Sequence, residues 1–97
     1  MLSGKQRSYL RGQANRLEPI IHIGKDGITE GLIKQVLEAL EAHELIKGRV
    51  LQNSLEEVED VARQLIEECG AELVQVIGNV FILFKRNEEE PVYHLPD

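Results

Sequence analysis

The apolar residues of this chain alternate between two kinds of spacing, and this alternation limits the fold more than any other feature. Stretches with an apolar residue every three or four positions, typical of amphipathic helices, are separated by short β-branched runs, typical of buried strands. Helices are expected over residues 3–16, 30–42 and 55–69, and strands over residues 20–23, 44–51, 73–77 and 80–84. The order helix, strand, helix, strand, helix, strand, strand predicts a layered α/β domain in which helices pack on a four-stranded mixed sheet.

Local signals define several of these boundaries. Capping boxes are expected at Ser3 with Gln6 and at Ser54 with Glu57, since a hydroxyl three residues before a Glu or Gln marks many helix starts. The pair Gly78-Asn79 suits a tight hairpin turn, because both residue types tolerate positive φ angles. The last two strands are therefore predicted to pair antiparallel.

The length of the chain sets the number of domains. Residues 1–97 are enough for one hydrophobic core and too few for a second, so a single domain is expected. After Arg86 the sequence turns polar and contains two prolines, which predicts a loosely ordered tail over residues 87–97. No run approaches the roughly 18–20 apolar residues of a membrane span, and no apolar secretion signal opens the chain, so we expect a cytoplasmic protein without a membrane partner.

The charges are unevenly distributed along the chain. The net charge is −6, yet residues 1–25 contain five basic residues and one acidic residue, whereas residues 26–97 contain six basic and sixteen acidic residues. Because charges interact strongly only within a Debye length of about 8 Å, a basic region can attract phosphates although the whole molecule is acidic. The overall charge therefore does not exclude a nucleic-acid ligand.

No group of residues predicts catalysis or metal binding. His22, His43 and His94 lack the close helical spacing of a zinc pair, and His22 is expected to be a core or half-buried residue of the first strand. Cys69 is the only cysteine and falls on the predicted inner face of the third helix. We therefore expect a protein that is not an enzyme and uses no cofactor, metal or small-molecule substrate.

The loop Gly24-Lys25-Asp26-Gly27 is a candidate phosphate-binding site. It joins a strand to a helix that Thr29 can cap, and free amides and the helix dipole attract anions at such a position. By spacing alone, an ordinary turn is the better interpretation, and the position between a strand and a capped helix makes the two interpretations equally good. A Gly-x-x-Gly loop is also how the KH class of RNA-binding domains holds an RNA backbone, which makes RNA the natural ligand.

Further basic residues could extend this site. They are Lys5, Arg7, Arg11 and Arg16 on the outer face of the first helix, and Lys47 and Arg49, which share one face of the second strand. We expect them to gather with Lys25 at one end of the molecule, although ordinary solubility explains a basic helix face equally well. Tyr9 is the only aromatic residue near the basic segment, so recognition of RNA backbone and shape is expected in preference to base readout.

Four segments resemble the CRM domain family (chloroplast RNA splicing and ribosome maturation), and the resemblance covers nearly the whole chain. They are QRSYLR at residues 6–11, GKDGIT at 24–29, HELIK at 43–47 and QVIG at 75–78. A chain of this size resembles the bacterial YhbY type of the family. The resemblance implies a fold similar to the C-terminal domain of a translation initiation factor, and RNA as the partner, specifically large-subunit ribosomal RNA or its precursor particle.

The resemblance also assigns roles to individual residues. Gly24, Lys25, Asp26 and Gly27 correspond to the RNA-contacting loop of the family, with the basic residues of the first helix beside it. Lys85 retains a positive charge at the end of the last strand. The family usually has histidines or basic residues at three places where this chain has Asn15-Arg16, Glu18 and Asn79. These departures lower the expected positive charge.

A second hypothesis treats the chain as an adaptor for proteins. The third helix presents a run of carboxylates that could dock a basic ribosomal protein: Glu56, Glu57, Glu59 and Asp60. The usual explanation of such a run is a solvated helix face.

Overall fold

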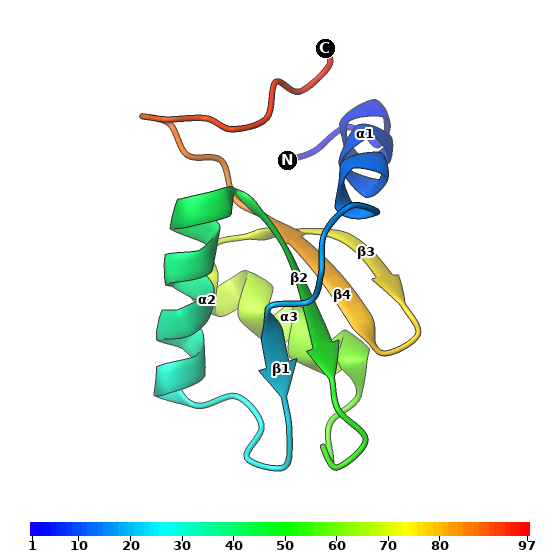
Figure 1. Ribbon diagram of the computed structural model, residues 1–97, viewed down its shortest axis with the longest axis vertical. Helices are drawn as coiled ribbons and strands as arrows, with labels where there is room; N and C mark the ends of the chain where they lie inside the picture. Colours follow the sequence, from blue (N-terminus) through cyan, green and yellow to red (C-terminus); the bar gives the residue numbers. More distant parts are fainter.

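The computed structural model describes residues 1–97 and has seven elements in the predicted order (Figure 1). They are α1 (Gly4–Ala14), β1 (Ile21–Ile23), α2 (Glu30–His43), β2 (Leu45–Val50), α3 (Val58–Cys69), β3 (Glu72–Ile77) and β4 (Val80–Phe84). The predicted α/β class and single domain are confirmed.

One mixed sheet contains all four strands, in the order β1-β2-β4-β3. β1 pairs parallel with β2, while β4 pairs antiparallel with both β2 and β3. The predicted hairpin between β3 and β4 is present, and of its two turn residues only Gly78 has a positive φ, at 57°.

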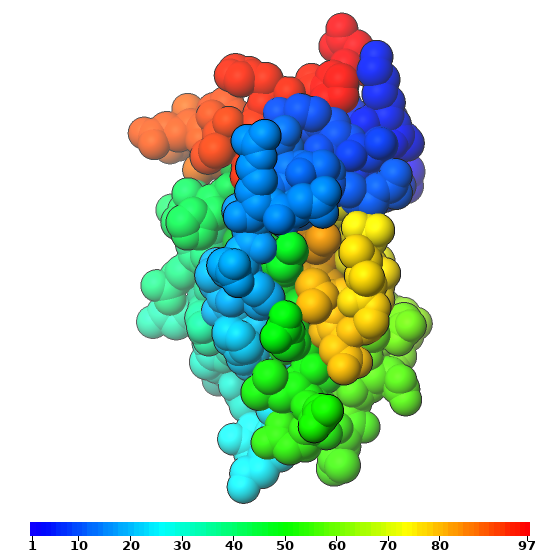
Figure 2. Space-filling view, turned by 45° about the vertical axis from the view of Figure 1, so that its right-hand side comes forward, coloured from blue at the N-terminus to red at the C-terminus, as the bar shows by residue number.

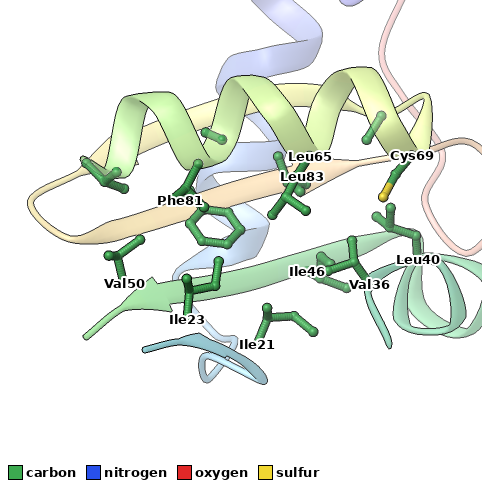
Figure 3. Packing of buried hydrophobic residues seen from close by; sticks show 14 residues of the cluster. Ile21, Ile23, Val36, Leu40, Ile46, Val50, Leu65, Cys69, Phe81 and Leu83 are labelled. Atoms are coloured by element: carbon green, nitrogen blue, oxygen red, sulfur yellow. The ribbon is translucent and has the colours of Figure 1, made fainter. Parts of the chain in front are cut away.

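Helices cover the two sheet faces unequally. α2 and α3 lie on one face and enclose the larger core, in which Ile46, Leu65 and Phe81 meet between helix and sheet (Figure 3). On the other face, α1 packs Leu10 against Leu45 in a smaller core at one end of the sheet (Figure 1). The rest of that face has no helix over it.

Gly48 makes room for the largest core side chain. A Cβ atom at Gly48 would lie 2.2 Å from the ring of Phe81, its register partner on β4. The strand β2 is continuous through this glycine over Leu45–Val50, because the Phe81 ring occupies the space that a side chain at Gly48 would need.

Two predicted helix starts have different outcomes. The capping box of α1 is present, with Ser3 Oγ accepting the N–H of Gln6 at 3.1 Å and the Gln6 side chain accepting the N–H of Ser3 at 3.0 Å. The capping box predicted at Ser54 and Glu57 is absent, so that prediction is wrong. Ser54 Oγ accepts the N–H of Glu56 inside a loop, and α3 begins only at Val58.

The C-terminal segment has no helix or strand, yet the buried side chain of Glu44 tethers it. The Glu44 carboxylate accepts backbone N–H groups from Asn87 at 2.7 Å, Val92 at 2.7 Å and Tyr93 at 2.8 Å. Tyr93 and Leu95 also pack against the smaller core. The segment expected to be a loose tail is thus attached at several points to the body of the domain.

Glu44 has an unusual backbone conformation, and its buried carboxyl group has a lowered pKa. It is the only non-glycine residue with a positive φ, at 65°, and its side chain has no exposed surface. Burial by itself raises the pKa of this carboxyl, but the three amide donors and the charge of Arg86 outweigh that effect and hold the pKa below its usual value. The native state therefore keeps a charged, fully hydrogen-bonded carboxylate inside the protein.

Replacement of Gly48 by Ala should destabilise the protein by about 1–3 kcal/mol, because the new methyl group collides with the Phe81 ring. In a Gly48→Ala/Phe81→Leu double variant the two costs should be less than additive in chemical denaturation. Gly12→Ala is the matched control, since its Cβ would meet nothing within 4 Å and the change should be neutral or stabilising. Additive costs at Gly48 and Phe81 would contradict the proposed contact.

Glu44→Gln should lower the free energy of unfolding at pH 7 by roughly 1.5–3 kcal/mol, because an amide cannot replace a carboxylate that accepts three N–H groups. A depressed folded-state pKa stabilises the protein above the unfolded pKa and loses that effect as the pH falls through the folded pKa. The gap between wild type and variant should therefore be constant near neutral pH and shrink below about pH 4. Glu41→Gln, which changes an exposed neighbouring carboxylate, is the control, and an equal pH dependence of both variants would refute this role for Glu44.

Candidate nucleic-acid interface

The part of the sheet without a helix over it carries polar, basic and apolar side chains together. We call this region the open face and define it by His22, Lys47, Arg49, Ile77 and Val80. Side chains alternate along a strand, so Lys47 and Arg49 lie on the same side as Leu45, which α1 covers. His22 and Val80 are the register partners of Arg49 on the two neighbouring strands. The strands therefore bring these side chains together on one surface.

His22 is exposed, whereas a core or half-buried position was expected. Ile21 and Ile23 are buried, and His22 between them is exposed. The alternation of side chains along a strand explains the outcome, since the two isoleucines fill the core side and turn the histidine outward.

Lys47 and Arg49 have no carboxylate partner. The structure contains two ion pairs, Met1 with Glu72 and Arg63 with Asp60, and neither involves the open face. Lys47 is half-buried and Arg49 is exposed. Both charges are therefore available to an anionic ligand.

Two shallow hollows lie beside Lys47, and Arg16 lines one of them. Arg16 and Lys47 line one hollow, and Lys47 and Arg49 line the other together with Ile77 and Val80; each has a volume of about 280 Å³. Leu17 contributes to both hollows. The structure thus brings together three predicted site residues, Arg16, Lys47 and Arg49, which we call the open-face cations.

The remaining basic residues divide between free and structural roles. Lys5 and Arg11 are exposed on α1. Arg7 is half-buried, and its Nε–H donates to the carbonyl of Leu73 at 3.2 Å, which fastens α1 to β3. Lys85 Nζ donates to the carbonyl of Cys69 at 2.9 Å and so caps the end of α3. Lys85 therefore does not lie on the open face.

Cys69 is buried as expected. Burial raises the pKa of its thiol; the charge of Lys85 lowers this pKa by less, and the charge of Glu68 raises it further. A thiol with a raised pKa is a poor nucleophile at neutral pH, in keeping with a core position.

The Gly24-Lys25-Asp26-Gly27 loop forms a hydrogen-bonded turn. The N–H of Gly27 donates to the carbonyl of Gly24 at 3.1 Å, so this amide is already used within the turn. Lys25 and Asp26 are exposed at its tip. Thr29 caps α2 as predicted, with Oγ accepting the N–H of Leu32 at 3.1 Å. An anion at this loop would therefore meet mainly Lys25 and the first amides of α2.

A carboxylate lies against this turn. A Cβ atom at Gly27 would come within 2.7 Å of Glu56 Oε2, and one at Gly24 within 3.3 Å of Asn53 Oδ1. Gly27 also has a φ of 65°, which favours glycine. Glu56, which was expected on the solvated face of a helix, instead precedes α3 and lies beside this turn. No local pattern could reveal this contact, because it joins two loops far apart along the chain.

The basic residues do not gather at one end of the molecule, and that prediction is wrong. α1 and the loop that contains Lys25 lie at opposite ends of the longest dimension, which extends 39 Å (Figure 1). The reason is the position of β1: the chain enters β1 from the α1 side and leaves it into the loop. Figure 2 shows both segments at the edges of one view, with β2 side chains between them. The charges are spread over a surface instead of concentrated at a point.

No helix in the structure combines the length and the apolar character needed to cross a bilayer. No three side chains of His, Cys, Asp or Glu are grouped where they could share a metal ion.

Comparisons with known proteins agree on one family. Residues 2–85 match the sequence model of the CRS1 / YhbY (CRM) domain. The chain is 48% identical to "Probable RNA-binding protein YqeI" of Bacillus subtilis, over 99% of this chain and 100% of that protein. It is 35% identical to a Haemophilus influenzae protein named "RNA-binding protein", over 94% of this chain and 92% of that protein.

A solved structure extends the agreement to three dimensions. The solution structure of protein SAV1595 from Staphylococcus aureus superposes with a TM-score of 0.82 at 45% sequence identity, and the match covers 99% of this chain and 100% of that one. Sequence and structure together show that the chain belongs to the CRS1 / YhbY (CRM) domain family.

Proposed function

We propose that this chain binds RNA without chemical change to it, with the open face as the main contact surface. The observation that carries the proposal is the position of Lys47 and Arg49 on an uncovered sheet face with Arg16 beside Lys47; none of the three is in an ion pair, and Glu18 is the one carboxylate that lines the two hollows. Unpaired cations in a row can contact successive phosphates of an RNA backbone. The names of the relatives in Bacillus and Haemophilus, which describe RNA binding, support the same ligand.

We further propose that the RNA is structured ribosomal RNA of the large subunit, or its precursor particle. This finer assignment rests on the resemblance to the YhbY type of the family. A role on ribosomal RNA would place the protein in the cytoplasm.

In this proposal the turn with Lys25 is a second, weaker contact. It lies at the far end of the molecule from α1, so an RNA that touches both Lys25 and the open-face cations must extend along the face. Glu56 beside Gly27 repels phosphate at that point. Lys5 and Arg11 on α1 can add contacts at the opposite end.

Binding of a ribosomal RNA fragment should weaken with salt. If about four phosphates are contacted, the logarithm of the affinity should fall with the logarithm of salt concentration at a slope of roughly −3 to −4. Lys47→Glu/Arg49→Glu should reduce the magnitude of the slope by about 2 and weaken binding at least tenfold, as measured by fluorescence anisotropy. Arg63→Glu reverses a charge on α3, behind the opposite sheet face, and should have little effect. Equal losses in both variants would refute the open face as the site.

Removal of the charge at Glu56 should strengthen RNA binding. A unit charge about 4 Å from a phosphate costs roughly 1 kcal/mol even in bulk water, so Glu56→Gln should raise the affinity up to about fivefold at low salt. The control is Glu59→Gln, an exposed carboxylate in the first turn of α3. If both variants gain affinity equally, the effect reflects the net charge of the protein, and the turn does not contact RNA.

A further inference from the structure

One of the two hollows beside Lys47 also borders Tyr93, and both apolar and basic residues line it. Leu17 and Ile20 form one wall, Val92 and Tyr93 form another, and Lys47 contributes from β2. We call this site the Tyr93 hollow. It is the more apolar of the two hollows beside Lys47 and has a volume of about 280 Å³. This size is at the lower limit of about 300 Å³ for small-molecule sites, which leaves room for one planar ring system.

The wall that contains Tyr93 is held in place from inside the protein. Glu44 accepts the N–H groups of Val92 and Tyr93, and the side chain of Tyr93 packs against the smaller core. Arg86 adds a bond from its guanidinium to the carbonyl of Tyr93 at 2.8 Å. The hollow is therefore formed before any ligand arrives, which lowers the entropic cost of binding.

Basic side chains dominate the polar part of the lining. Arg16, His43 and Lys47 line the hollow, and Glu18 is the single acidic residue among them. The apolar lining, which includes Tyr93, suits a flat, uncharged group, while Arg16 and Lys47 suit an anionic group attached to it. A nucleotide combines these two parts, because its base is flat and apolar on both faces and its phosphate is negative.

We infer that the Tyr93 hollow accepts one unpaired nucleobase of the bound RNA, with Arg16 and Lys47 on the adjoining phosphate. The inference rests on the proposed RNA-binding function and deepens it: the preferred ligand is a folded RNA from which a single base protrudes. Lys47 belongs both to this hollow and to the open-face cations, so a backbone that lies on the open face passes directly beside it. The tail residues that complete the site fall outside the part of the chain that matches the family.

The test compares two RNA hairpins that differ only by one bulged uridine in the stem. Wild-type protein should bind the bulged hairpin about tenfold more tightly in fluorescence anisotropy, the size of one base–aromatic stack. Tyr93→Ala should abolish this preference, and Tyr93→Phe, which keeps the ring, should retain it. Ala42→Phe should also abolish it, because Ala42 lines the hollow and a larger side chain would fill it.

Controls separate the hollow from the stability of the domain and from RNA binding itself. Tyr9→Ala removes the other tyrosine that packs on the smaller core but does not line the hollow, so it should keep the preference. The inference is overturned if both Tyr93→Ala and Ala42→Phe still prefer the bulged hairpin. It is also overturned if the wild type shows no such preference. If the wild type binds neither hairpin in a salt-dependent way, the proposed function itself fails.

Discussion

The unequal covering of the two sheet faces determines the rest of this structure. Two helices, α2 and α3, cover one face, whereas α1 covers only one end of the other. A lysine and an arginine in the middle of a central strand would be costly if a helix lay over them, since a buried unpaired charge is strongly destabilising. Because no helix covers Lys47 and Arg49, their charges do not carry this cost and remain free for a ligand.

Glu44 connects this arrangement to the site. It follows α2 directly, precedes β2 directly and holds the C-terminal segment through three backbone amides. A single buried carboxylate at the junction of α2 and β2 thus anchors the backbone of Tyr93. The strain of its positive φ, about 1–3 kcal/mol for such a conformation, is offset by these bonds. The same interaction stabilises the fold and shapes the hollow beside the open-face cations.

The order and type of all seven elements could be predicted from the sequence, because apolar spacing reflects which side of each element meets the core. The caps at Ser3 and Thr29 could be predicted for the same reason, since each depends on residues within one turn. The cap at Ser54 could not, because the loop after β2 is stabilised by its own hydrogen bonds and delays the start of α3.

The candidate site could be predicted only in part. Local pattern placed Lys47 and Arg49 on one face and Lys25 at a turn, and the structure agrees with both placements. The contact of Glu56 with Gly27 and the position of Tyr93 depend on residues that meet only in the folded chain. The distance between α1 and the Gly24–Gly27 turn depends on where α1 packs on the sheet, which the sequence pattern does not contain.

The most direct test of the account is a titration of isotope-labelled protein with a structured ribosomal RNA fragment, followed by amide chemical-shift mapping. The account predicts the largest shifts on β2 around Lys47 and Arg49 and in the segment around Arg16, with smaller ones at the turn that contains Lys25. Shifts confined to α3 around Glu59 and Asp60, with an unchanged open face, would contradict it and favour an adaptor that binds basic proteins through its acidic helix.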